Sequence, residues 1–321
     1  MNTLSVETVT LPKENTYLAL VVLISVIVWA LLAMAMFPIF YAVMGFISVW
    51  IGNGLLVASL RAEGVKIGKD QLPELEQALH EVCAKLEIYK IPELYVIQSG
   101  GMLNAFAARH SRRKFIVVYS ELLEAYGPAS SEIKFLLGHE LGHIKRKHMI
   151  KQLILFPGLL MPLLGNAYYR ACEASCDRFG AFASDDIDAS VSAMMVMSGG
   201  KRAGRTLNAP AFANQYLQMR GFFVSWHELM SGYPTLSQRV SNLLSLKGGQ
   251  EPSSSFRHPL AYLFALFGIG GRSSGGANLL VMVAIIGLLA AIGIPSILNA
   301  YEMAEQKAAE RDAQQIYLPV D

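Results

Sequence analysis

Residues 131–148 read Ser-Glu-Ile-Lys-Phe-Leu-Leu-Gly-His-Glu-Leu-Gly-His-Ile-Lys-Arg-Lys-His, and this stretch says more about the chain than any other. Cap-like residues open it and an apolar run follows, which predicts a long helix over 133–148. Histidines at i and i+4 of a helix project from one face about one turn apart, so His139 and His143 can bind one zinc ion. Glu140 lies between them and can accept a proton from water. The alternative is a solvated helix, but the apolar residues beside the histidines indicate burial.

A third metal ligand is expected, because a catalytic zinc site uses three protein ligands and one open position. The segment Arg-Ala-Cys-Glu-Ala-Ser-Cys-Asp at 170–177 places Glu173 and Asp177 four residues apart on a predicted helix. One carboxylate can then bind the metal while the other supports a ligand. Such a pair alone is typical of a solvated helix face. Its position one helix after the histidine motif favours a ligand.

An uncharged apolar run, 153–164, separates the two motifs. If this run crossed a bilayer once, Glu173 and His139 would lie on opposite sides of the membrane, and it is too short to cross twice. We therefore predict a helix that bends near Pro157 and Pro162. Two placements stay open for it, one packed inside the domain and one on the membrane surface.

The composition points to a membrane protein. Of 321 residues, 53% are hydrophobic and only 16% are charged, whereas a soluble domain has about a quarter charged residues. The net charge of +2 and the lack of a basic cluster with interleaved aromatics exclude nucleic acid as the expected partner. Three cysteines cannot form a disulfide framework, and without a C-x-x-C pair we interpret Cys172 and Cys176 as buried thiols.

Long uncharged stretches predict three membrane spans. Residues 17–60 contain no Asp, Glu, Lys or Arg, which is enough for two spanning helices, about 17–37 and 39–60, divided at Pro38. A buried pair of apolar core helices is the alternative. Residues 277–300 form a third candidate span. The remaining segments are a polar N-terminus at 1–16, a linker at 251–276 whose part 259–268 is a candidate interfacial segment, and an acidic tail at 301–321.

The flanking charges predict the orientation. Basic residues concentrate on the flanks that face the central region: Arg61, Lys66, Lys69, Arg257 and Arg272. By the positive-inside rule, the N-terminus and residues 61–250 face the cytoplasm, and the tail lies opposite.

The central region has ordinary polarity and mixed patterning. A helical pattern covers 72–86, and strand-like runs cover 93–97 and 114–119. We therefore expect an α+β domain at 61–250, mainly α with a small β-sheet, joined to an N-terminal transmembrane hairpin and one C-terminal transmembrane helix.

From residue 72 to residue 246 the chain resembles the gluzincin family of membrane zinc metallopeptidases, which includes HtpX, the CAAX prenyl protease and the mitochondrial Oma-type protease. The motifs that carry the resemblance are H-E-x-x-H and E-x-x-x-D. The resemblance implies a zincin-like domain with one Zn2+ per chain. It implies the zinc ligands His139, His143 and Glu173, with Glu140 as general base. Asp177 then orients a ligand histidine.

Two further segments are similar to that family. Asn104-Ala105-Phe106 matches an edge strand beside the cleft, which can bind an extended substrate through its backbone. Around 233–239, Arg239 matches a family arginine expected to pair with Asp177 or brace the site. Tyr233 departs from the family's histidine, and its hydroxyl can still donate to a developing oxyanion. A packed turn tyrosine is the alternative.

These observations predict a membrane-anchored zinc endopeptidase that cleaves membrane or misfolded proteins, as in quality control, in a bacterial inner membrane. Its partners are a protein or peptide substrate and the lipid bilayer. The alternative is a catalytically inactive zinc-binding protein that acts by binding partners, although such a protein has no need of Glu140. The candidate spans lack the ionisable residues of a transporter. We expect His227 to be structural, because a fourth protein ligand would close the site to water.

Overall fold

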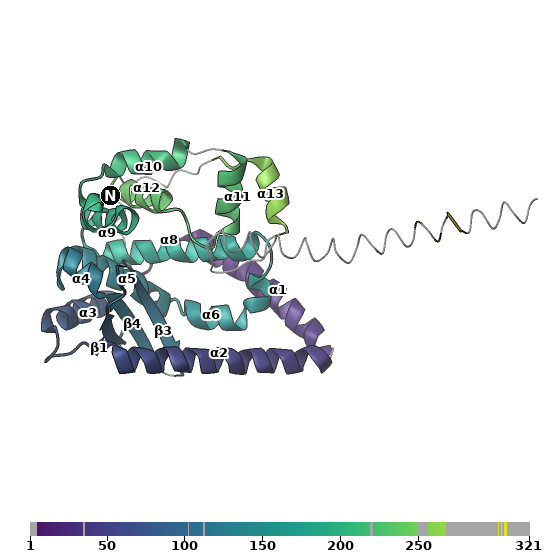
Figure 1. Cartoon of the computed structure of the whole chain (residues 1–321), viewed down its shortest axis with the longest axis horizontal. Coiled ribbons are helices and arrows are strands. Elements are labelled where there is room, and N and C mark those ends of the chain that lie inside the picture. Colours follow the sequence, from purple (N-terminus) through teal and green to yellow (C-terminus); the bar gives the residue numbers. More distant parts are fainter. Residues whose placement is uncertain are drawn as a thin grey trace, which may run out of the picture.

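A computed structural model describes residues 5–34, 36–101, 103–111, 113–218, 221–248 and 256–267, together with residues 301, 303, 305 and 306. It confirms a mainly helical chain with a small β-sheet and two apolar N-terminal helices (Figure 1). The predicted third span at 277–300 and the Gly/Ser-rich part of the linker at 270–276 lie outside the described residues, as does nearly all of the tail at 301–321.

The sheet has four strands in the order β1-β2-β4-β3. The strands are β1 (Val65–Lys66), β2 (Glu93–Ile97), β3 (Ala105–His110) and β4 (Arg113–Tyr119). The two predicted strands are β2 and β4, which pair in parallel, whereas β3 pairs antiparallel with β4 and forms one edge. The register pairs Ala105 with Val118 and His110 with Arg113.

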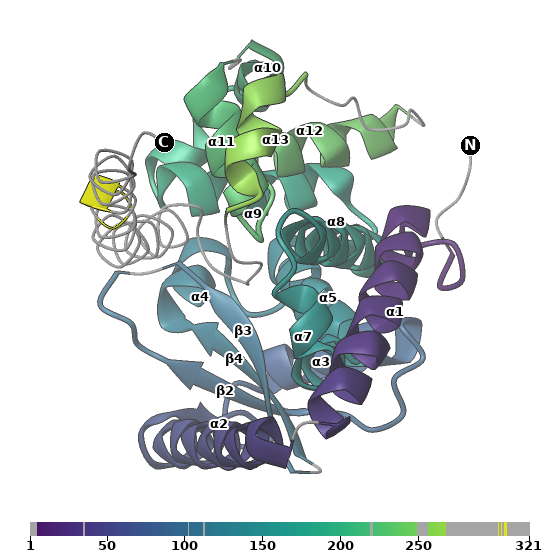
Figure 2. The ribbon, with the colours of Figure 1, turned by 90° about the vertical axis from the view of Figure 1, so that its right-hand side faces the viewer.

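Helices cover both faces of the sheet, which explains why its central strand is an unbroken apolar run. On one face, Ile116 and Val118 belong to the core formed with α3 (Pro73–Lys85), α4 (Ser120–Tyr126) and α5 (Ser131–Lys145). On the other face, Phe115 and Val117 contact the end of α2 (Met36–Glu63). Figure 2 shows α2 lying beneath the strands. The C-terminal end of this apolar helix is therefore part of the folded domain.

The centre of the molecule is the packing of α5 against α8 (Leu164–Ser184). Glycines let the two helices approach closely. A Cβ added to Gly138 would lie 2.5 Å from the Cβ of Ala183, and one added to Gly180 would lie 2.6 Å from the backbone oxygen of Phe135. Any larger residue at either position would push α5 and α8 apart.

The chain between these helices departs from the prediction. The helix expected to reach His148 ends at Lys145, because Lys147 adopts the left-handed conformation with φ 56°. Two short helices follow, α6 (His148–Ile154) and α7 (Phe156–Leu159), in place of one bent helix. Pro157 lies in the first turn of α7 and Pro162 lies two residues before α8, positions where proline fits without breaking a helix.

The remaining helices form a layer on the far side of α8, drawn in green in Figure 1. These elements are α9 (Ile187–Gly199), the 3-10 turn η1 (Ala203–Arg205), α10 (Ala209–Gln218), α11 (Phe222–Met230), α12 (Leu236–Lys247) and α13 (Pro259–Ala265). Helix α13 lies in the predicted interfacial segment. Its Ala261 and Ala265 pack on α11, while Leu263 and Phe267 near its end are exposed.

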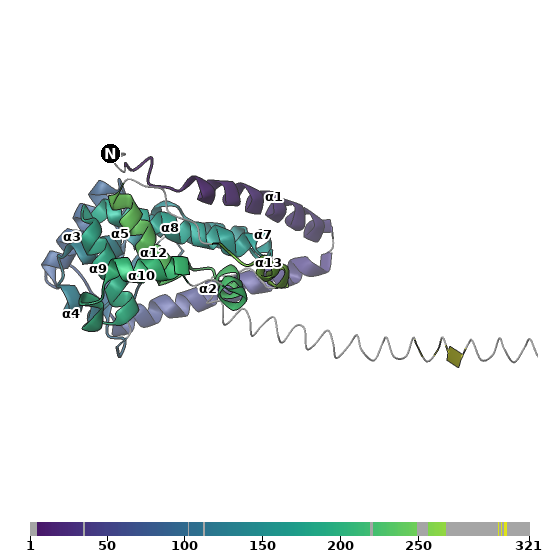
Figure 3. The same cartoon turned by 90° about the horizontal axis from the view of Figure 1, so that it is seen from above.

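The two N-terminal helices are long and apolar enough to cross a membrane, over Pro12–Leu31 and Val43–Glu63. They are α1 (Pro12–Met34) and α2, so Pro38 lies in the first turn of the second helix. In Figure 3 they lie close at one end and diverge toward the domain. Helix α1 packs alongside α7 and α8. Its Ser25 donates a hydrogen bond to the backbone oxygen of Leu155, just before α7, and its Trp29 donates one to the backbone oxygen of Ile154 at the end of α6.

Candidate metal centre

The α5–α8 packing brings together the three residues expected to bind a metal. His139 and His143 lie on one face of α5, Glu173 faces them from α8, and all three are at least 93% buried. The Nε2 atom of His139 lies 3.3 Å from one carboxylate oxygen of Glu173, and the Nε2 atom of His143 lies 3.4 Å from the other. Two imidazoles and one carboxylate therefore converge on a single point.

These separations fit a metal better than a direct ion pair. A charge-assisted hydrogen bond between nitrogen and oxygen spans about 2.7–2.9 Å. Ligand atoms placed about 2.0–2.1 Å from a tetrahedral zinc lie roughly 3.3 Å from each other. The observed separations of 3.3 Å and 3.4 Å match the second arrangement. Nitrogen and oxygen donors in this combination are also the ones that catalytic zinc sites use.

The electrostatics of the site favour a cation. Burial alone would lower the pKa of His139, but hydrogen bonds and charges from Asp177 and Glu173 outweigh burial and raise this pKa to about 9. Two buried carboxylates thus face the histidine pair, and positive charge placed between them is stabilised.

Asp177 and Arg239 hold the first histidine. One carboxylate oxygen of Asp177 lies 2.9 Å from Nδ1 of His139, on the ring side away from Glu173. Arg239, on α12, donates two hydrogen bonds to the same carboxylate, from Nε at 2.8 Å and from a terminal nitrogen at 2.5 Å. Burial would raise the pKa of Asp177, but the Arg239 charge outweighs it and holds this pKa below its usual value. The ionised carboxylate fixes the imidazole with Nε2 directed at Glu173.

The other predicted site residues lie on α5, in the turn before α12 and on α11. Glu140 is buried on α5 immediately after His139. Tyr233 lies in the turn before α12, where the Ser231 hydroxyl bonds its backbone N–H and oxygen, and its side chain is 36% exposed. His227 is exposed on α11 and belongs to none of the metal-competent groups in the described part of the chain.

The predicted substrate strand lies at the edge of the sheet. Asn104 immediately precedes β3, and Ala105 and Phe106 open it. The Tyr119 N–H donates to the Asn104 oxygen, so residues 104, 106 and 108 direct their backbone groups at β4. By the same alternation, Ala107 directs its N–H at the open edge. The N–H of Ala105 also points outward, but the side chain of Asn104 accepts it at 2.9 Å.

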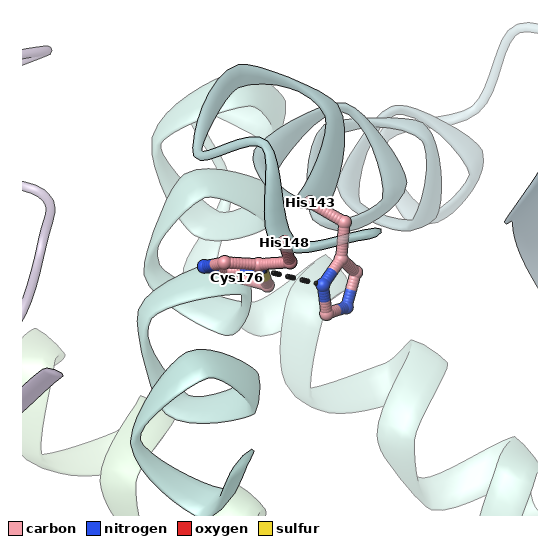
Figure 4. A group of neighbouring side chains, drawn as sticks. All are labelled: His143, His148 and Cys176. Carbon is pink, nitrogen blue, oxygen red and sulfur yellow. Dashed lines mark hydrogen bonds between the residues drawn. The ribbon is translucent and has the colours of Figure 1, made fainter. Parts of the chain in front are cut away.

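Three buried or half-buried polar residues beside the centre were not anticipated from the sequence. His148, at the start of α6, lies with its Nδ1 2.9 Å from Nδ1 of His143 (Figure 4). Its Nε2 lies 3.0 Å from Glu14 on α1, and Arg146 donates to the same Glu14 oxygen at 2.9 Å. Two signals existed in the sequence: a third histidine five residues after the motif, and an acidic residue at the head of an uncharged run.

Comparison with known proteins agrees with this geometry. The sequence matches peptidase family M48 over residues 69–247, more than half of the chain. It is 32% identical over 168 residues to the plastoglobule-localized metallopeptidase 48, chloroplastic, of Arabidopsis thaliana. The alignment covers 47% of this chain and 48% of that relative, so the chain spans about half the length of the curated relative it matches. No solved structure matches the chain. The match over 69–247 shows that the chain belongs to peptidase family M48, the members of which are zinc metallopeptidases that hydrolyse peptide bonds.

Proposed function

We propose that this chain is a membrane-anchored zinc endopeptidase that cleaves membrane or misfolded proteins as part of quality control. The observation that carries the proposal is the convergence of His139, His143 and Glu173 at separations that suit one zinc ion. The family supplies the reaction class, and the apolar helices α1 and α2 supply the reason to expect substrates close to lipid.

In the proposed site, His139, His143 and Glu173 hold one Zn2+. When bound, zinc polarises the scissile carbonyl and the attacking water. Glu140 accepts the proton of that water and later delivers it to the leaving amine, which is general acid–base work for a single buried carboxylate. Asp177 keeps the proton of His139 on Nδ1, and Arg239 keeps Asp177 ionised.

Substrate binding is proposed along β3. An extended peptide can add to an open sheet edge through backbone hydrogen bonds, which gives affinity with little side-chain selectivity. The outward N–H of Ala107 is one donor for such a strand. Asn104, Ala105 and Phe106 lie at the start of β3, beside the end of β4 that continues into α4. Low side-chain selectivity suits a protease that clears damaged proteins.

Tyr233 is proposed to donate its hydroxyl to the oxyanion that forms as the peptide carbonyl is attacked. Its partly exposed place in the turn before α12 leaves the side chain accessible to substrate. Tyr233→Phe removes this donor and retains the ring, so a variant with unchanged kcat would assign the residue to packing alone.

For the membrane arrangement, we propose that α1, α2 and residues 277–300 span the bilayer, with the peptidase domain on the cytoplasmic side of a bacterial inner membrane. The basic flanking residues support this orientation. Exposed apolar side chains of α1 and α2 support contact with lipid, among them Leu23, Val26, Leu31, Trp50 and Leu55.

The decisive experiment uses the full chain purified in detergent. We expect about one zinc per chain and cleavage of casein or a membrane-protein substrate. Glu140→Gln should retain the zinc and lose activity by at least a hundredfold, in line with the contribution of a general base. Glu132→Gln, on the first turn of the same helix, is the matched control and should remain active.

The same experiment distinguishes the proposed peptidase from the alternative, a catalytically inactive zinc-binding protein that acts by binding partners. That protein would bind zinc in both forms and cleave nothing in either. A wild-type chain without zinc would contradict the metal site itself.

A further inference from the structure

We infer that His148 and Glu14 are positioning residues that fix the second histidine of the metal centre, so that the N-terminal helix α1 forms part of that centre. The inference rests on the proposed role of His143 as a zinc ligand. Its physical basis is a chain of three buried polar groups with hydrogen-bond distances at each step, from His143 to His148 at 2.9 Å and from His148 to Glu14 at 3.0 Å.

A bound metal would fix the protonation of each ring in this chain of polar groups. His143 directs Nε2 at Glu173, so that atom must keep its lone pair for the metal and the proton lies on Nδ1. Nδ1–H of His143 then donates to Nδ1 of His148. The proton of His148 therefore lies on Nε2, which donates to Glu14. Each donor in the chain has one acceptor, and only one set of tautomers satisfies all of them.

The two ligand histidines have similar hydrogen-bonded supports. Nδ1 of His139 meets a buried carboxylate that an arginine holds, Asp177 with Arg239. Nδ1 of His143 meets the same arrangement with one imidazole inserted, and here Arg146 donates to the Glu14 carboxylate at 2.9 Å. A carboxylate behind a ligand histidine fixes its ring and raises its basicity. Both ligands of α5 thus have a carboxylate support, one from α8 and one from α1.

The buried position of Glu14 needs a physical explanation. Its side chain is fully buried, although it lies at the head of a helix that is apolar from Tyr17 onward. A buried carboxylate costs several kcal/mol unless it is paired and hydrogen-bonded. Segments on both sides of it are fixed to the domain: Val9 is fully buried in the main core, and Val21 packs with Tyr168 and Cys172. This apolar packing would hold α1 against the domain without any buried charge. We therefore attribute the burial of the Glu14 carboxylate to its hydrogen bonds with His148 and Arg146.

A second metal ion is the competing interpretation, because His143, His148 and Cys176 lie close together (Figure 4). One distance and one charge argue against it. The Nδ1 atoms of the two histidines are 2.9 Å apart, a hydrogen-bond length and shorter than the roughly 3.3 Å between ligands of one zinc. The Glu14 oxygen that meets His148 also accepts from the Arg146 guanidinium, and that positive charge would repel a metal.

The test measures zinc affinity of the full chain in detergent by competition with a chelator. His148→Leu should remove the imidazole that accepts from Nδ1–H of His143 and weaken zinc binding about tenfold to a hundredfold, the usual effect of removing such a support. His148→Asn retains an acceptor near the former Nδ1 position and should recover part of the loss. His80→Leu, an exposed histidine on α3, is the matched control and should bind zinc as the wild type does.

Glu14→Gln tests the far end of the chain. It should weaken zinc binding by less than His148→Leu, because the amide oxygen can still accept from His148. The double variant Glu14→Gln/His148→Asn should be weaker by less than the product of the two single effects, since the residues act in series. Glu7→Gln, exposed in the segment before α1, is its control.

The outcomes distinguish the claims. Wild-type zinc affinity in folded His148→Asn and Glu14→Gln proteins would overturn the inference and leave the proposed function intact. A wild type with two zinc ions, reduced to one by His148→Leu, would assign His148 as a ligand and also overturn it. A wild type that binds no zinc would instead refute the proposed function. Glu14→Gln conserves volume, and His148→Asn places a smaller polar side chain in the same space, so neither adds bulk to the core and the test does not depend on a folded leucine variant.

Discussion

At the scale of single residues, the ion pair between Asp177 and Arg239 determines how the metal centre responds to substitution. Both side chains are buried, and each satisfies the other through a two-pronged contact that a lysine cannot reproduce. Removing one charge from such a pair leaves the other charge buried and unpaired, which costs about 3–5 kcal/mol. The pair therefore couples the stability of the fold to the orientation of His139.

Asp177→Asn is expected to lower both thermal stability and zinc affinity, the latter by about tenfold to a hundredfold. The stability difference from wild type should depend on pH. The pKa of Asp177 is lowered below its usual 3.8, so its stabilisation is fully present above that value and is lost as pH falls through the depressed folded pKa. Thermal unfolding of the zinc-free proteins from pH 7 to pH 3 measures this.

Asp188→Asn is the control for this prediction. Asp188 pairs with Lys247 at the surface, and its side chain is 70% exposed. A surface pair contributes little, so this variant should match the wild type. If Asp177→Asn were equally neutral at pH 7, the buried pair would not support His139 in the way argued above.

At the scale of secondary-structure elements, the separation of α5 and α8 sets the distances between the metal ligands. No loop contributes to the triad, so the geometry depends on how closely the two helices approach. Gly138 lies one residue before His139, and an added Cβ there would meet Ala183 and the backbone of Gly180.

Gly138→Ala should therefore force the helices apart and destabilise the protein by about 1–3 kcal/mol. Because Glu173 moves with α8, zinc affinity should fall as well. Gly142→Ala is the graded comparison, since its Cβ would meet Phe179 and Cys176 side-chain atoms at 3.1–3.2 Å and the nearest contacts can relax. Melting temperature and zinc titration of both variants check the order; a more damaging Gly142→Ala would contradict it.

The edge strand β3 allows a second prediction at this scale. Ala107→Pro removes an N–H that faces the open edge, and sheet edges tolerate proline where no ladder bond is lost. We expect a KM several-fold higher with little change in melting temperature. Ala107→Ser retains the N–H and serves as control. Equal KM values for both variants would place the substrate elsewhere.

The sequence predicted elements well where one period or one motif determined them. Strand β2 and helix α3 follow from their apolar patterns, and the shared face of His139 and His143 follows from their spacing. Spacing alone left open whether Glu173 or Asp177 joins them, and the family resemblance named Glu173. The predicted end of α5 at His148 was wrong, because the left-handed turn at Lys147 depends on tertiary contacts that bring His148 back to His143. Glu14 was missed because it lies more than a hundred residues away from its partners, and no local pattern reports such a pairing.

At the scale of the whole molecule, the two apolar N-terminal helices pack against the peptidase domain, each through a buried cluster of its own. The segment before α1 contributes Val9 to the main hydrophobic cluster, and Ser175 accepts a hydrogen bond from the Leu11 backbone. Helix α2 closes the opposite side of the sheet through Val57 and Leu60. The two apolar helices therefore lie against different sides of the domain, α1 beside α7 and α8 and α2 beneath the sheet, as Figure 2 shows, and Figure 3 gives the same arrangement from above.

A fragment limited to residues 61–250 should therefore fail to form a stable zinc site, although it contains every motif residue of the family. It lacks α2, which covers one face of the sheet, and α1, which packs on α8 and contributes Glu14. We expect aggregation, or a soluble protein whose zinc affinity is at least tenfold weaker than that of the full chain. Expression of both forms with zinc analysis measures this. A fragment with full zinc affinity would show that the site does not need the packing of α1 and α2.

The place of Glu14, three residues into α1, also has a consequence for which bonds can be cut. In the proposed arrangement, the helix that supports the metal centre is the one that enters lipid, and its predicted span begins at residue 17, within one turn of Glu14. The catalytic centre therefore works at a short, constant height above the headgroups. A polypeptide becomes cleavable where it emerges from the bilayer in an unfolded state, and a segment far out in the aqueous phase stays out of range however extended it is.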